Sequence, residues 1–100
     1  MIGIASPAFC FSAFEEVLED ISKHFTLWEV LVEGEHRLDL ARDAMLGAME
    51  SFDMRFQIHA PMSDVNIGSI YEPMREVAVK EIVATIEACR DMGISIVTIH

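Results

Sequence analysis

Two short apolar runs, each ending at a histidine, constrain the fold of this 100-residue chain more than any other feature. Residues 55–59 read as a strand that ends at His59, and a polar loop then leads into a long helix. Residues 94–99 form a second apolar run, which His100 follows. Parallel α/β proteins present functional side chains at the carboxyl ends of strands in this way. The two histidines are therefore the first candidates for a functional site.

Strand and helix patterns alternate along the rest of the chain. The sequence predicts strands at residues 2–5, 28–32, 55–59 and 94–99, and helices near 13–23, 38–52 and 70–92, where apolar residues recur at helical spacing. Ser12 and Ser69 each stand three residues before a glutamate, which predicts a capping box at two helix starts. The connections are long enough for right-handed parallel crossovers. The predicted order is β-α-β-α-β-α-β.

The predicted strands are polar on one face only. A parallel sheet covered by helices on both faces would be apolar on both, so a barrel whose inner face opens into a site fits better. Such a barrel has eight strands, and the chain is predicted to be the N-terminal half of a TIM (β/α)8 barrel. Residues 1–100 then form a single half-barrel domain of a longer protein, or a fragment that self-associates through its open sheet edges. The polar positions are Glu29, Glu33, Gln57, His59, Thr98 and His100.

The composition narrows the classes of partner. The formal net charge is −10, and this field argues against binding to nucleic acid or to an anionic membrane. No apolar run approaches the roughly 20 residues of a membrane span and no signal peptide is evident, so we expect a cytoplasmic protein. Cys10 and Cys89 lack CxxC spacing and are predicted to be free structural thiols.

Several segments together resemble the xylose isomerase-like TIM-barrel superfamily. They are His59-Ala60-Pro61, residues 64–69 (DVNIGS), Arg75, Ala88, Met92-Gly93 and residues 97–100 (VTIH). Within the superfamily they look most like the sugar phosphate isomerase/epimerase group that is similar to endonuclease IV. The resemblance implies a divalent metal ion (Zn, Mn, Fe or Co) at the strand ends, with His59 and His100 as ligands. Met62 stands where the family usually has an aromatic residue.

Polar residues near these histidines are candidates for contacts with a substrate. Glu29 and Glu33 could bind substrate or support the metal ligands. An interior ion pair is equally expected for Glu29, and a solvated turn position is slightly favoured for Glu33. Asn66 is predicted to line the pocket, and Asp64 to form the turn before the helix.

Other polar residues are expected to be structural. An ion pair with Glu72 is the favoured role of Arg75. His24 and His36 are predicted to be solvated.

The resemblance implies a metal-dependent isomerase or epimerase acting on a sugar or sugar phosphate. In that chemistry the metal stabilises an enediolate while carboxylates, expected largely beyond residue 100, move the proton. One alternative is an endonuclease IV-like phosphodiesterase acting on abasic DNA. Another is a non-catalytic half-barrel that self-associates, and we expect this inactive state for residues 1–100 in isolation.

Overall fold

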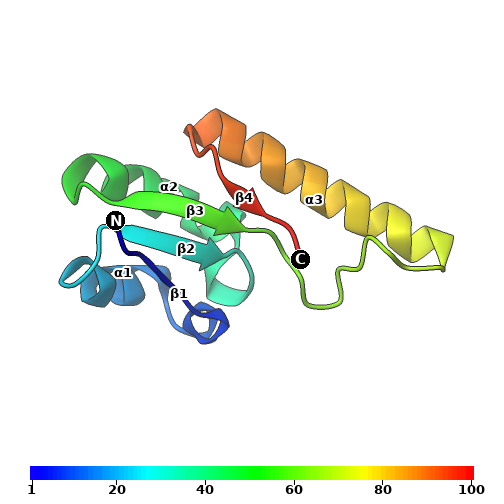
Figure 1. Ribbon diagram of the computed structural model, residues 1–100, viewed down its shortest axis with the longest axis horizontal. Helices are drawn as coiled ribbons and strands as arrows, with labels where there is room; N and C mark the ends of the chain where they lie inside the picture. The colour runs from blue at the N-terminus through cyan, green and yellow to red at the C-terminus, as the bar shows by residue number, and fades with distance from the viewer.

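A computed structural model describes residues 1–100 and shows four parallel strands alternating with helices (Figure 1). The strand order follows the chain order, β1-β2-β3-β4, and every neighbouring pair is parallel. The predicted α/β fold class is confirmed. The strands are β1 (Ile4–Ala5), β2 (Leu27–Leu31), β3 (Arg55–His59) and β4 (Val97–Thr98); the helices are α1 (Phe14–Ser22), α2 (Leu38–Ser51) and α3 (Glu72–Met92), with 3-10 turns η1 (Pro7–Phe11) and η2 (Gly34–His36).

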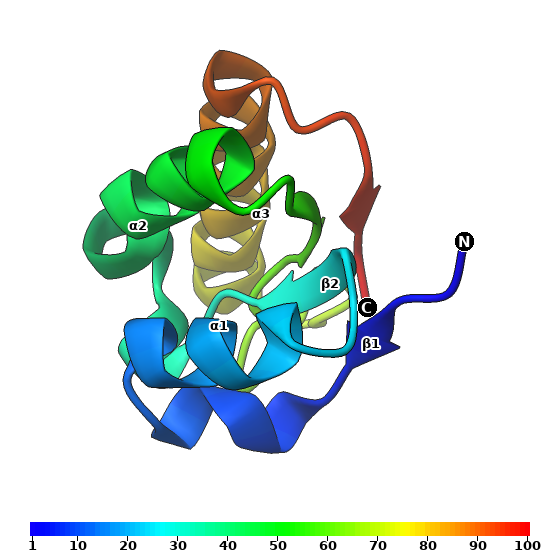
Figure 2. The same ribbon diagram turned by 90° about the vertical axis from the view of Figure 1, so that its left-hand side faces the viewer.

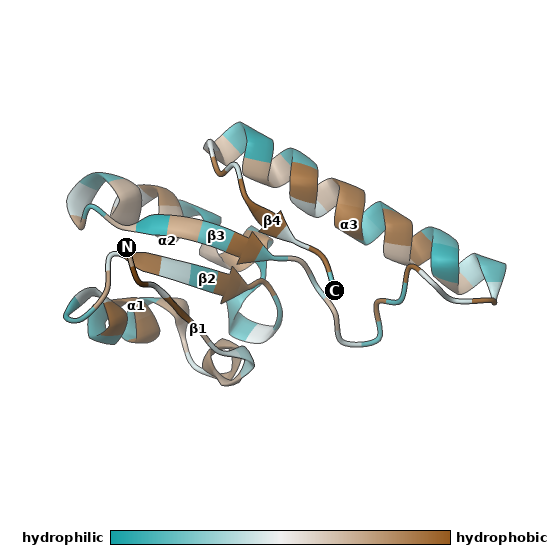
Figure 3. Ribbon diagram, in the orientation of Figure 1, coloured by the Kyte–Doolittle hydropathy of each residue, from teal (hydrophilic) through white to brown (hydrophobic).

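The three α-helices lie on one side of the sheet, as the end view shows (Figure 2). Trp28 pairs with Phe56, and Val30 with Ile58; all four side chains are buried beneath the helices. They belong to one hydrophobic cluster that also includes residues of all three helices. Apolar positions, drawn in brown, recur along the whole of α3 (Figure 3). Some of these side chains are buried and others are exposed.

The opposite sheet face is polar, as the sequence predicts, and its side chains lean toward one another. The Oγ1 of Thr98 on β4 donates a hydrogen bond of 3.1 Å to Oε2 of Glu29 on β2. Strands β2 and β4 are not neighbours, since β3 lies between them. The bond therefore reaches across two interstrand spacings of about 4.8 Å each. Such contact over β3 fits a sheet that curls toward its polar face, as a barrel wall does.

The two predicted capping boxes are wrong. Ser12 ends η1 instead, because its amide donates to the carbonyl of Phe9, and α1 starts at Phe14 without a side-chain cap. The Oγ of Ser69 accepts from the amide of Tyr71, and α3 starts only at Glu72. At Ser69 the hydroxyl thus bonds an amide nearer than the one a capping box would use, which is how serine competes with helix initiation.

The prediction of a solvated His36 is also wrong, since this ring is only 1% exposed. Its Nε2 lies 2.9 Å from the carbonyl oxygen of Ser12, and the ring meets Phe14 and Trp28 edge-on. Gly34 makes this approach possible: its φ is +56°, and a Cβ there would lie 2.5 Å from the carbonyl oxygen of Cys10. Turn η2 therefore packs directly on η1.

Of the remaining predictions about local structure, the state of the cysteines is confirmed and the length of the last strand is not. Cys10 and Cys89 are free and buried, as expected. Strand β4 is shorter than the predicted residues 94–99, and Ile94 closes α3 instead by donating its amide to the carbonyl of Cys89. No helix of the chain is both long enough and apolar enough to cross a membrane.

Candidate functional site

His59 and His100, which lie 41 positions apart in the numbering, meet at the carboxyl edge of the sheet. Their ring centroids are 5.8 Å apart. Both line a cavity of about 220 Å³, together with Glu29, Met62 and residues 5–7, which span the end of β1 and the start of η1. His59 is half-buried and His100 is exposed. Side chains from the ends of all four strands thus gather in one place.

A backbone hydrogen bond fixes the tautomer of His59. Its Nδ1 lies 2.8 Å from the carbonyl oxygen of Ala60. A carbonyl oxygen can only accept a hydrogen bond, so in the neutral ring Nδ1 carries the proton and Nε2 keeps its lone pair. Metal-bound histidines generally donate their other N–H to a carbonyl or carboxylate in this way. Sequence reasoning missed this acceptor, whose only signal is its place directly after His59.

Glu29 is the carboxylate of the cavity. It lines the cavity with both histidines and accepts the hydroxyl of Thr98 through Oε2. The interior ion pair that the sequence left open is absent, since none of the four salt bridges in the chain includes Glu29. Its second oxygen makes no hydrogen bond within the protein, so it is free to accept one from a ligand hydroxyl.

Glu33 lies beside this cavity and lines a larger one of about 540 Å³ next to α2 and α3. Its Oε2 accepts the amide of Met62 at 2.5 Å and the amide of Ser63 at 2.9 Å. Burial raises the pKa of Glu33, but hydrogen bonds from Ser63 and Met62 and the nearby His59 outweigh it and lower the pKa below its ordinary value. The residue is therefore an anchored carboxylate rather than a solvated turn residue.

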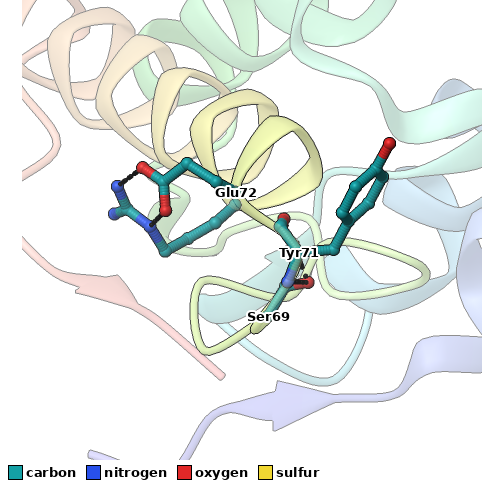
Figure 4. A network of polar contacts seen from close by, with 4 residues as sticks. Ser69, Tyr71 and Glu72 are labelled. Carbon is teal, nitrogen blue, oxygen red and sulfur yellow. Dashed lines mark hydrogen bonds and ion pairs between the residues drawn. The ribbon is translucent and has the colours of Figure 1, made fainter.

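The structure does not bring Asn66 to the cavity. Its Oδ1 accepts the amide of Gly68 at 2.9 Å, which makes Asn66 the side chain that forms the turn, and it is exposed. Asp64 also lies in this loop, with a left-handed φ of +61°. The expected ion pair is present, since two guanidinium nitrogens of Arg75 contact Glu72 (Figure 4). Arg75 is thus held on α3, away from the cavity.

The number of metal-ligating side chains that come together limits the metal site that residues 1–100 can form. No group of three or more His, Cys, Asp or Glu side chains converges on one point. His59 and His100 therefore offer two imidazole donors, a chemistry that suits Zn, Mn, Fe or Co. A catalytic zinc site usually has three protein ligands, so this pair fits part of a metal site.

A curled parallel sheet with helices outside and polar side chains at its carboxyl end is the architecture of a TIM-barrel segment. The fold comparison agrees: 95% of the chain superposes on a crystal structure of a D-tagatose 3-epimerase-like protein, with a TM-score of 0.81 and 26% identity. The predicted resemblance to the xylose isomerase-like TIM-barrel superfamily is thereby confirmed.

A curated relative is an uncharacterized protein of Methanocaldococcus jannaschii, 29% identical over 98% of the chain. The chain spans about a third of both proteins, 34% of the relative and 35% of the epimerase-like chain. No family model matches the sequence.

Proposed function

We propose that this chain forms part of a metal-dependent isomerase or epimerase that acts on a sugar or sugar phosphate. The observation that carries the proposal is the meeting of His59 and His100 at one cavity, with the Nε2 lone pair of His59 free. The likeness to a D-tagatose 3-epimerase-like protein supports the sugar as substrate class.

In this proposal, His59 and His100 would hold a divalent ion (Zn, Mn, Fe or Co) while the Ala60 carbonyl orients the first ring. When bound, the ion supplies a Lewis acid that polarises a carbonyl and its neighbouring hydroxyl. Glu29, which lines the cavity, would accept a substrate hydroxyl through its unbonded oxygen. Glu33 and Asn66, the other substrate contacts that the sequence predicts, do not line this cavity, so the proposal assigns them no contact with the substrate.

Metal binding is the first test. The chain is titrated with Zn²⁺ or Co²⁺ while the imidazole resonances are followed by NMR. We expect His59→Ala and His100→Ala each to weaken binding by at least about tenfold, since even the loss of an outer-shell partner has that effect. His24→Ala is the matched control, because His24 is exposed and lies outside the cavity.

The sugar is tested on the metal-loaded chain. D-tagatose should shift the resonances of His59 and His100 without turnover, since the proton-moving carboxylates are expected outside residues 1–100. Equal metal affinity in all three histidine variants would contradict the metal site. Unmoved resonances with the sugar present would contradict the substrate class.

A second candidate function is self-association with another copy of the chain, without catalysis. Two observations support it: Val79, Val83 and Ile86 on α3 are 37%, 45% and 43% exposed, and β4 has an unpaired edge. Exposed apolar patches and open strand edges both favour association. Cleavage of abasic DNA has less support, because the net charge is −10, and Arg37 and Arg75 are already paired with carboxylates.

A further inference from the structure

Glu33 joins two loops of the sheet edge that are far apart in sequence. Glu33 is the second residue after the end of β2. Its partners Met62 and Ser63 belong to the loop after β3. One carboxylate oxygen accepts both amides. Hydrogen bonds from backbone N–H groups to a carboxylate are stronger than those between neutral groups. The bond pair is therefore a strong link between these loops.

The linked loop also holds the functional ring. The amide of Ala60 donates to the carbonyl of Thr98 at 2.9 Å, and Ala60 is fully buried. Glu33 holds the same segment at Ser63, three residues after Ala60. Pro61, which lies between Ala60 and Ser63, has a φ that its ring fixes. Because both ends are held, rotation of the Ala60 carbonyl is restricted, and this carbonyl is the acceptor for Nδ1 of His59.

We propose that Glu33 is a positioning residue that fixes the 60–63 loop, so that the Ala60 carbonyl holds His59 with its Nε2 lone pair available to a ligand. This rests on the proposed function, which makes His59 a metal ligand. Glu33 itself lies outside the cavity of the two histidines and acts on His59 through the backbone.

The experiment measures the His59 tautomer in the whole chain by ¹⁵N NMR of the imidazole, without metal or sugar and at a pH where the ring is neutral. Amide exchange at Met62 and Ser63 is recorded on the same samples. The variants are Glu33→Ala, which removes the acceptor, and Glu33→Gln, which keeps an acceptor oxygen without the charge. Glu35→Ala is the matched control: it removes a carboxylate two positions away that accepts no hydrogen bond.

We expect the unchanged chain to hold His59 as the Nδ1–H tautomer and Glu33→Ala to give a mixture of both tautomers. Exchange at the two amides should rise by about tenfold, as the loss of hydrogen bonds to a charged acceptor implies. Glu33→Gln should restore most of the tautomer preference, and Glu35→Ala should change neither readout. A merely structural role would alter stability without moving the tautomer.

An unchanged His59 tautomer in folded Glu33→Ala would overturn the proposal, as would an equal change in Glu35→Ala. If Glu33→Ala does not fold, Glu33→Asp takes its place, because it keeps the charge but shortens the reach to Met62 and Ser63. The readout needs neither metal nor sugar. Failure of metal binding and failure of this link are therefore distinguishable results.

Discussion

His36 connects the two 3-10 turns that lie between the strand ends and the helices. Its ring bonds the Ser12 carbonyl and contacts Phe14 and Trp28, so it is part of the core although it is ionisable. Burial lowers the pKa of His36, and the opposing influence of the Ser12 carbonyl, Glu35 and Glu15 is smaller. The folded state therefore favours the neutral ring.

This burial predicts a loss of stability in mild acid. The pKa of His36 is lower in the folded state than its ordinary value near 6.5, so the unfolded chain takes up the proton first. The free energy of unfolding should therefore fall as the pH drops below about 6.5, and level off below the lowered folded pKa. Urea unfolding at a series of pH values measures this slope.

The control for that experiment is His36→Gln, which cannot titrate. The free energy of unfolding of this variant should be lower at every pH, because the ring contacts are lost. It should also change less between pH 7 and 5, the window set by the ordinary histidine pKa of about 6.5. Parallel curves for both proteins would refute the assignment to His36. The lowered pKa of Glu33 adds a separate loss in a more acidic window, as its carboxylate becomes protonated.

Helix ends show what local sequence can predict. The end of α3 at Gly93 follows from a backbone requirement, a φ of +77° that glycine meets without strain. The starts of α1 and α3 do not follow from Ser12 and Ser69: the amide of Ser12 closes η1, and the hydroxyl of Ser69 accepts the amide of Tyr71 before the helix begins. The burial of His36 does not follow from local sequence either, since it depends on contact with Ser12, 24 residues away at the end of η1.

Gly93, which caps the end of α3, and Gly47, inside α2, should respond to alanine in opposite ways. Gly93→Ala places a Cβ in a left-handed conformation and should destabilise the chain by about 1 kcal/mol. Gly47 lies within α2 with nothing within 4 Å of an added Cβ, so Gly47→Ala should stabilise it by about 0.5–1 kcal/mol. Thermal or urea unfolding of the two variants checks both signs. A stabilising Gly93→Ala would contradict the left-handed helix end.

At the scale of the molecule, hydrophobic periodicity is enough to predict the parallel sheet and its one polar face. Strands that alternate Trp28 and Val30 with Glu29 leave only one face to bury. Periodicity also brings His59 and His100 to one edge. It cannot predict the Ala60 carbonyl or the Glu33 link, since both depend on how loops far apart in sequence approach one another.

The same patterning leaves α3 with a second apolar stripe, at Val79, Val83 and Ile86, which the sheet does not cover. If this stripe and the β4 edge mediate self-association, sedimentation velocity should show oligomers that grow with concentration. The double variant Val83→Lys with Ile86→Lys should shift the chain toward monomer, because lysine at a contact opposes burial.

The matched control is Glu76→Gln with Glu87→Gln, two exposed positions on the same helix. Each pair of substitutions adds two positive charge units, from −10 to −8, so a difference between them reports the stripe rather than net charge. We expect the glutamine pair to associate as the unchanged chain does, or slightly more strongly, since lower net charge weakens repulsion. A chain that stays monomeric at every concentration would rule out self-association through this surface.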